Sequence, residues 1–392
     1  MLIVNAEIHT MNGPSIPCGY VYVEGGTICA VGAMPAPETV RTAGEEAVID
    51  AQGGALYPGF VDAHTHLGMW EDGLGFEGDD GNEDTDPSTP QLRAIDAVNP
   101  LDRCFGEALA AGVTTVVTGP GSANPIGGQL CAMKTYGRRI EDMLIQAPIA
   151  MKMALGENPK STYHGKSQAP VTRMATASII RDQLAQARRY EEDKRRSAED
   201  DETDEPEYDA KCEALLPVLR GEVPVHFHAH RLDDIFTAVR IAREFGLDYR
   251  IVHGTQGHKA ADLLAADRVR VFCGPLLCDR SKPELSDLTP ANPARLHEAG
   301  VELCIVTDHP VIPEQYLPLC AGLAVREGLP REEALRAITL SPALLLGLED
   351  RVGSIAPGRD ADLVLFREDP LTVSAKPALV IAGGCVAAGT EA

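Results

Sequence analysis

The chain has 392 residues, of which 44% are hydrophobic, and this length suits a barrel of roughly 250 residues plus an appended module. Its 35 Lys and Arg against 58 Asp and Glu give a formal net charge of −23, which disfavours nucleic acid and anionic membranes as partners. The ten cysteines lack zinc-finger spacing, so we expect free thiols in a reducing compartment.

The sequence shows no signal for export or for membrane insertion. The segment after Met1 has no basic region followed by a long apolar run, and no apolar segment reaches the roughly 20 residues of a membrane span. We therefore expect a cytoplasmic protein. Because the net negative charge disfavours nucleic acid and anionic membranes, we expect its partner to be a small-molecule substrate. A homo-oligomer is compatible with the sequence, because most oligomers of soluble proteins are symmetric assemblies of one chain.

The predicted elements change in character along the chain. Residues 2–32 have the pattern of short strands joined by turns, and from Gly59 onward apolar runs alternate with helical periodicity. The expected barrel strands are Phe60–His66, Val113–Thr118, Leu130–Lys134, Ile149–Leu155, Val223–Ala229, Tyr249–His253, Val269–Cys273 and Val301–Thr307. The expected helices are Asp102–Ala111, Ala177–Arg195, Asp234–Phe245, Lys259–Ala266, Asn292–Ala299, Glu314–Glu327 and Arg331–Leu348. Eight strands separated by helices predict an α/β fold, a (β/α)8 TIM-like barrel.

Strand patterning returns at Val352, near the end of the chain. The simplest arrangement joins residues 1–56 and 350–392 into one small composite β-sandwich module, with the barrel of residues 57–349 inserted between them. This arrangement predicts two domains, and the metal chemistry described below falls in the barrel.

Three polar segments interrupt the regular pattern. Irregular stretches at 68–99 and 156–171 exceed ordinary loop lengths, and both should emerge at the C-terminal face of the barrel, where barrel enzymes keep their active sites. The first of these contains the acidic, glycine-rich segment 71–86. The charged tract 191–209 is expected to be a solvated helix end and turn.

Histidines and one aspartate stand at the ends of four predicted strands. His64 and His66 lie two residues apart, so in a strand both side chains point to the same face. His228, His253 and Asp308 end the fifth, sixth and eighth predicted strands. Imidazole and carboxylate groups are the usual ligands of zinc and similar ions. The pattern predicts a site for one or two divalent ions, with zinc expected and manganese, iron or cobalt accepted by the same ligands.

The chain resembles the amidohydrolase superfamily. The resemblance rests on Pro58-Gly-Phe-Val-Asp-Ala-His-Thr-His, on Thr307-Asp308, and on Gly353-Ser-Ile-Ala-Pro-Gly-Arg-Asp-Ala-Asp-Leu-Val-Leu, and it covers nearly the whole chain. It implies a metal-bearing barrel with a composite β module. It also implies a metal-ligand set of His64, His66, His228, His253 and Asp308.

The fourth strand decides between subtypes of such a site. Many members that resemble this chain bridge two metals with a carboxylated lysine there, and Lys152 stands at a comparable place; others use a glutamate, and Glu157 lies just beyond it. A lysine inside a crowded barrel should not stay charged without a partner, and carboxylation or a nearby carboxylate would remove that cost. We favour Lys152 over Glu157, and a mononuclear site that needs neither stays open.

The residues after His228 narrow the chemistry. In resembling deaminases and imidazolone-hydrolysing enzymes, a glutamate that handles protons follows the metal histidine by three residues, whereas this chain has Arg231 there, after His230. The segment is more similar to the prolidase-like branch and to members related to imidazolonepropionase. This favours hydrolysis of an amide in a small peptide, acyl-amino acid or cyclic amide over deamination or imidazolone hydrolysis, and an inactive metal-stabilised scaffold is the non-enzymatic alternative.

The expected mechanism is attack by metal-activated water, with Asp308 as general base and as ligand. A metal or His230 would polarise the scissile carbonyl. Arg173 or Arg231 could clamp a substrate carboxylate, and Asn158 and Tyr163 are further candidates for substrate contacts.

Overall fold

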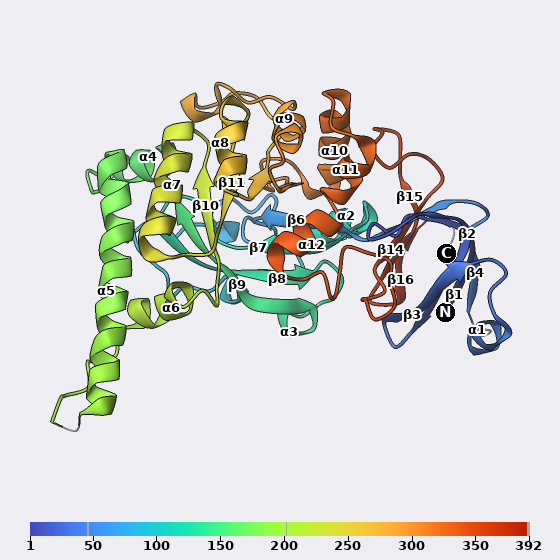
Figure 1. The fold of residues 1–392 in the computed structure, drawn as a ribbon, viewed down its shortest axis with the longest axis horizontal. Helices are drawn as coiled ribbons and strands as arrows, with labels where there is room; N and C mark the ends of the chain where they lie inside the picture. The colour runs from blue at the N-terminus through green and yellow to red at the C-terminus, as the bar shows by residue number, and fades with distance from the viewer. Residues whose placement is uncertain (45–46, 201, 390–392) are drawn as a thin grey trace.

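The computed structural model describes residues 1–44, 47–200 and 202–389. Parts of the charged tract 191–209 and of the terminal segment 350–392 therefore fall outside the described residues. The described chain contains two eight-stranded sheets. Figure 1 shows one sheet in the middle of the molecule, ringed by helices, and the other beside it at the end where both termini lie.

The central sheet is a nearly closed barrel with the strand order β13-β12-β11-β10-β9-β8-β7-β6. Its two edge strands meet, because His66 N–H donates to the His309 carbonyl at 2.9 Å and Asp308 N–H donates to the His64 carbonyl at 3.2 Å. All eight expected strands are present. They are β6 (Phe60–Thr65), β7 (Val113–Thr118), β8 (Ile126–Lys134), β9 (Leu144–Ala154), β10 (Val225–Ala229), β11 (Tyr249–His253), β12 (Val271–Cys273) and β13 (Leu303–Ile305).

The expectation of eight strands separated by helices is wrong at β8, which runs antiparallel to both β7 and β9. Only residues 119–125 join β7 to β8, and the short helix α3 (Ile140–Met143) precedes β9. A parallel pair needs a crossover of about a dozen residues or more, so these short connections force the chain to reverse. The remaining barrel pairs are parallel.

Helices cover the outside of the barrel, and α2, α5 and α6 begin at a side-chain cap. Asp102, Thr172 and Asp209 each accept a hydrogen bond from a backbone N–H in the first turn of the helix that follows. The helices around the barrel are α2 (Arg103–Ala110), α4 (Glu157–Gly165), α5 (Arg173–Glu199), α6 (Ala210–Leu219), α7 (Leu232–Phe245), α8 (Ala261–Ala266), α9 (Asn292–Glu298), α10 (Leu317–Arg326), α11 (Arg331–Arg336) and α12 (Leu340–Leu346).

Four of these helices differ from the sequence-based expectation. Helix α4 occupies the segment expected to be an irregular loop, and α6 was not expected. The expected helix 331–348 is two helices, which places Pro342 in the first turn of α12, where its missing N–H costs no helical hydrogen bond. Within the described residues, every helix is too short or too polar to span a membrane.

The second sheet combines strands from both ends of the chain. Its members are β1 (Leu2–Ile8), β2 (Ile16–Glu24), β3 (Thr27–Ala33), β4 (Val48–Asp50), β5 (Ala55–Pro58), β14 (Leu363–Phe366), β15 (Pro377–Ala382) and β16 (Cys385–Gly389), with the short helix α1 (Glu38–Ala43) between β3 and β4. Strand β5 joins the two halves, pairing with β1 on one side and β14 on the other. The strands form one hydrogen-bonded sheet, and β5 crosses the boundary expected at residue 56. The two-layer sandwich and the domain division stay predictions.

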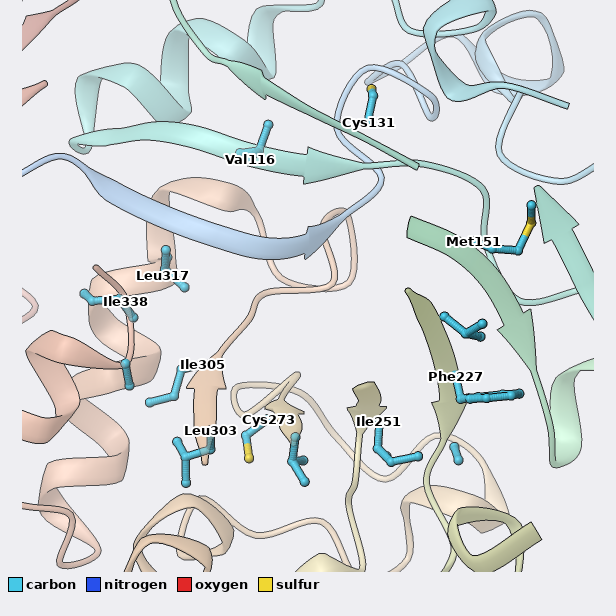
Figure 2. Packing of buried hydrophobic residues seen from close by; sticks show 14 of the residues in the cluster. Val116, Cys131, Met151, Phe227, Ile251, Cys273, Leu303, Ile305, Leu317 and Ile338 are labelled. Carbon is cyan, nitrogen blue, oxygen red and sulfur yellow. The ribbon is translucent and has the colours of Figure 1, made fainter. Parts of the chain in front are cut away.

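The barrel strands place alternate side chains in different environments. Figure 2 shows Met151, Phe227, Ile251, Cys273 and Ile305 in the larger apolar cluster, which also includes residues of the surrounding helices. The intervening positions of the same strands, such as Ala150, Val252, Phe272 and Cys304, form a separate buried cluster that packs against α12. Lys152 lies between two members of the first cluster, Met151 and Met153, and His228 lies between Phe227 and Ala229, so both polar side chains face the barrel interior.

Candidate active site

Seven polar side chains meet at the C-terminal end of the barrel, and all but one of them are at most 5% exposed. Strand β6 supplies His64 and the residue after its end, His66, while β9, β10 and β11 supply Lys152, His228 and His253. His230 follows β10, and Asp308 follows β13. Potential ligand atoms lie within 4.8 Å of one another in two sets that share His253: His228 with His230, and His64 with Asp308. The structure therefore brings together six of the residues expected to bind metal, with His230 as an addition.

Two residues of this site adopt a left-handed backbone conformation. His253 has φ of 77° and Asp308 has φ of 59°, which are unusual values for residues other than glycine. Strict alternation would place His253 on the same face as Ile251, among the apolar residues outside the barrel. Its ring instead stacks on His230 with centroids 4.3 Å apart. The backbone at 253 thus turns the imidazole into the barrel mouth, and unusual backbone conformations of this kind concentrate at functional sites.

Backbone carbonyls fix the tautomers of two histidines. The Nδ1 atoms of His66 and His253 lie 2.7 Å and 2.8 Å from the carbonyl oxygens of Gly119 and Gly274. Because a carbonyl oxygen only accepts, each Nδ1 carries the hydrogen and each Nε2 presents a lone pair. The Nε2 of His66 lies 3.3 Å from Asp308 Oδ1. Two acceptors that face each other at this distance need a proton or a metal ion between them, and these donor atoms fit a divalent metal.

Burial keeps four imidazoles of the site uncharged, those of His64, His228, His230 and His253. It lowers the pKa of His253 to about 4 and lowers the pKa values of His228 and His230 well below the ordinary range. Burial and then the neighbouring Lys152 ammonium lower the pKa of His64 in the same way. Neutral imidazole is the form that binds a metal. Within the described chain, the buried His64 Nδ1 and His228 Nε2 have no hydrogen-bond partner.

Lys152 and Asp308 are the charged members of the cluster. Lys152 Nζ lies 3.1 Å from His64 Nε2, and burial lowers the pKa of this ammonium to about 8. Burial would raise the pKa of Asp308, but His253, His64 and His66 outweigh it and hold that pKa well below its ordinary value. Asp308 is therefore a carboxylate at neutral pH.

A cavity of about 490 Å³ opens onto this cluster. It is lined by His66, His228 and Asp308 and by residues that bring no metal ligand: Trp70, Asn82, Gly121, Ser122, Ala123, Asn158, Ser161, Thr162, Lys282, Pro310 and Val311. A Cβ atom at Gly81 or at Gly121 would overlap the Trp70 indole, so these two glycines let the ring pack tightly between them. The indole also meets the edge of His66, with ring centroids 4.7 Å apart.

Asn158 is the one expected substrate-binding residue that lines this cavity. Tyr163 is fully buried and donates to Asn124 Oδ1 at 2.6 Å, which makes it part of the packing. Arg173 and Arg231 line a different cavity of about 430 Å³, where they pair with Asp234 and Asp233, each at 2.9 Å. Both guanidinium groups therefore face aspartates away from the cavity of Asp308, and their role as a substrate clamp stays a prediction.

Glu157 also lines the second cavity, where its carboxylate accepts the Glu284 N–H at 3.1 Å. The structure thus places Lys152, and not Glu157, against His64. His230 is not among the described residues that line the cavity of Asp308. Its proximity to His228 and His253 groups it with the potential ligands and not with the substrate-facing side chains.

Sequence reasoning missed two residues of the site, Lys282 and Glu284. The Glu284 carboxylate is 1% exposed, lies 3.6 Å from His228 Nε2 and from His230 Nε2, and pairs with Lys282 Nζ at 2.7 Å. Burial raises the pKa of Glu284, but His230 and Lys282 outweigh this effect and hold that pKa below its ordinary value. Glu284 lies in a single 3-10 turn (Pro283–Leu285) after β12 and Lys282 directly precedes it, and so short an element has no periodicity that could have indicated their position.

The model of the amidohydrolase family matches residues 55–388. The chain belongs to this family. A crystal structure of an amidohydrolase from Thermotoga maritima MSB8 has 41% sequence identity and a TM-score of 0.93, with 98% of each chain covered. This agreement supports the barrel and its amidohydrolase architecture over the whole chain.

Two curated relatives extend the comparison of this amidohydrolase. The chain is 34% identical to "Amidohydrolase tasK" of Hapsidospora irregularis over 92% of its own length, but it spans 39% of that protein. It is 28% identical to an imidazolonepropionase of Symbiobacterium thermophilum, covering 90% of this chain and 84% of the relative. An adenosine deaminase structure from Xanthomonas campestris with bound zinc, at 19% identity and a TM-score of 0.53 over 98% of this chain and 92% of that one, shares the fold. The family and these relatives support a hydrolase.

Proposed function

We propose that this amidohydrolase is a metal-dependent hydrolase of a carbon–nitrogen amide bond in a small peptide, acyl-amino acid or cyclic amide. One observation carries the proposal: neutral histidines and the Asp308 carboxylate place their ligand atoms within 4.8 Å of one another beside a substrate-sized cavity. A solvent-accessible cavity that ends on an electron-rich donor set is typical of catalytic metal sites.

The donor atoms fall into two groups, one on each side of Lys152 and His253. His64, His66 and Asp308 would hold one ion, and His228 with His230 and His253 would support a second. Lys152 Nζ lies beside His64, and carboxylation of this amine would convert an uncompensated buried cation into an anionic ligand. We expect zinc, since imidazole and carboxylate ligands suit it, and manganese, iron or cobalt would accept the same atoms.

A bound divalent ion would lower the pKa of water from about 15.7 towards about 7 and so supply a nucleophile near neutral pH. Asp308 lines the cavity as a carboxylate, so it can accept the proton of the attacking water. The same carboxyl group then returns the proton to the leaving nitrogen. Trp70 and the glycine-containing segment that includes Gly121 form one wall of the cavity.

A second candidate is hydrolysis of an imidazolone-type ring or release of ammonia from a heterocycle. Glu284 favours it, because this carboxylate lies 3.6 Å from both His228 and His230, on the side of the site where Arg231 replaces the expected glutamate. The similarity to an imidazolonepropionase also favours it. Ammonia release from the substrate distinguishes a deaminase from an amide or ring hydrolase.

The test is elemental analysis of protein purified without chelator, followed by assays of a panel of dipeptides, acyl-amino acids and cyclic amides. We expect one or two divalent ions per chain, loss of turnover on chelation with retained folding, and recovery on addition of zinc. Full turnover in metal-free protein would overturn the metal-dependent mechanism. Metal-replete, folded protein that hydrolyses no amide or ring of the panel would instead support the inactive scaffold.

A further inference from the structure

The cavity beside the metal-ligand cluster contains a cation that this mechanism does not use. We propose that Lys282 binds a carboxylate of the substrate, so that the preferred substrates are acyl-amino acids or dipeptides with a free carboxylate. This inference rests on the proposed amide hydrolysis and specifies which amides the site selects.

The first observation is the position of Lys282. Its side chain lines the same cavity as Asp308 and His228, and it is the one lysine or arginine among the described residues that do so. The chain as a whole carries a net charge of −23, so its long-range field does not attract anions. Selection of an anionic substrate must therefore come from a local contact, and Lys282 is the cationic side chain in the described lining of this cavity that can make it.

The second observation is the hydrogen bonding of the ammonium group. Lys282 Nζ contacts Glu284 Oε1 at 2.7 Å and donates to Asn158 Oδ1 at 2.9 Å. An ammonium group has three N–H donors, so a third remains for a ligand. The side chain is 30% exposed, which leaves it accessible from the cavity.

The same contacts hold the lysine in place before a substrate arrives. Asn158, on α4, continues the network by donating from Nδ2 to Ser122 Oγ at 2.7 Å on the segment after β7. A flexible lysine usually loses rotamer freedom when it binds a ligand, and this loss weakens binding. Because Glu284 and Asn158 already fix Lys282, the ammonium is preorganised for a carboxylate.

The remaining walls fit the rest of an acyl-amino acid. Trp70, Pro310 and Val311 provide apolar surface in a cavity of about 490 Å³, which suits a small ligand. The substrate would place its carboxylate against Lys282, its apolar side chain against these residues, and its amide between Lys282 and Asp308.

Trp70 is the chain's single tryptophan, so its fluorescence reports occupancy of this cavity independently of turnover. The probes are the ketomethylene isostere of N-acetyl-L-leucine, in which CH2 replaces the amide N–H, and the primary carboxamide of that isostere. Both are titrated into the metal-loaded enzyme. The measured quantity is the ratio of the two dissociation constants, because a general disturbance of the cavity affects both compounds alike.

We expect the wild type to bind the carboxylate at least tenfold more tightly than the carboxamide. Lys282→Met should bring this ratio close to one, and Lys282→Arg should restore most of it. The matched control is Lys259→Met, because Lys259 also pairs with a carboxylate at 2.7 Å, that of Asp287, but does not line the cavity. This variant should keep the wild-type ratio.

A wild-type ratio near one, or a tenfold preference that survives in Lys282→Met, would overturn the inference. Measurement of the wild type alone decides the first outcome, even if the lysine variants fold poorly. If amides are hydrolysed but the ratio is near one, the inference fails and the proposed function stands. If the ratio depends on Lys282 but no amide is hydrolysed, the carboxylate site stands and the proposed function fails.

Discussion

Two cavities share the helix α4 as a wall, and they differ in how their charges are used. The cavity of about 490 Å³ contains Asp308 and Lys282 among neutral polar and aromatic residues. The cavity of about 430 Å³ is richer in charge, with Glu157, Lys160, Arg173, Arg231 and Glu284. Its arginines are paired with aspartates, whereas Asp308 faces lone pairs of histidines. The density of charge is therefore a poor guide to function here. The position of a charge relative to the histidine cluster is a better one, since Lys282 is itself paired with Glu284 at 2.7 Å.

The largest expected contrast concerns kcat, and it compares Asp308 with Asp233, the partner of Arg231 beside the second cavity. Asp308→Asn should preserve the fold but lower kcat by about 10³-fold, because the amide cannot accept the proton of the attacking water. Asp233→Asn, at an exposed aspartate paired with Arg231, should leave kcat within about twofold. Steady-state kinetics on a hydrolysed amide measure both values. Near-normal turnover of Asp308→Asn would remove Asp308 as the base.

The next contrast concerns metal content. Lys152→Ala should lower the metal content to one ion or none, because Lys152 Nζ lies 3.1 Å from a proposed ligand, His64. Glu157→Gln should leave it unchanged, because that carboxylate accepts the Glu284 N–H in the other cavity. Elemental analysis of the two purified variants checks this. The opposite pattern would transfer the bridging role to Glu157.

A smaller effect is expected when an ion pair beside the charged cavity is removed, and it concerns the free energy of unfolding of the protein. Arg173→Met leaves Asp234, which is 2% exposed, without its ion-pair partner at 2.9 Å. An unsatisfied buried polar group costs about 1–3 kcal/mol, so the free energy of unfolding should fall by that amount. Denaturant unfolding measures the change, and kcat/KM per folded molecule should stay near the wild-type value. A selective rise in KM for carboxylate substrates would return Arg173 to the substrate site.

The smallest effect is expected for Arg231→Met. The Arg231 and Asp233 side chains are 43% and 49% exposed, and a solvated ion pair of this kind contributes about 0–1 kcal/mol. Both the unfolding midpoint and kcat/KM should therefore lie close to those of the wild type. A tenfold loss of kcat/KM without loss of metal would show that this guanidinium contacts the substrate.

The sequence by itself determined the strand sequence of the barrel and most of the site. Apolar runs bounded by turns located all eight strands, because a strand buried on both faces must be apolar along its length. The residues His64, His66, His228 and Asp308 could be found because each stands where such a run ends. The ten cysteines are free, as their scattered spacing indicated.

Tertiary structure decided what depends on direction or on contacts between distant segments. The reversal of β8 follows from the length of its connections, and the inward turn of His253 follows from its backbone φ, which strand alternation does not predict. Glu284 reaches the histidines from a single 3-10 turn after β12, and Arg173 is neutralised by Asp234, 61 residues away in the chain. A local pattern specifies which residues are buried or polar, but the partner of a charged group is set by the packing of the whole chain. Here that packing places Lys282 in the cavity of Asp308 and both arginines in the other cavity.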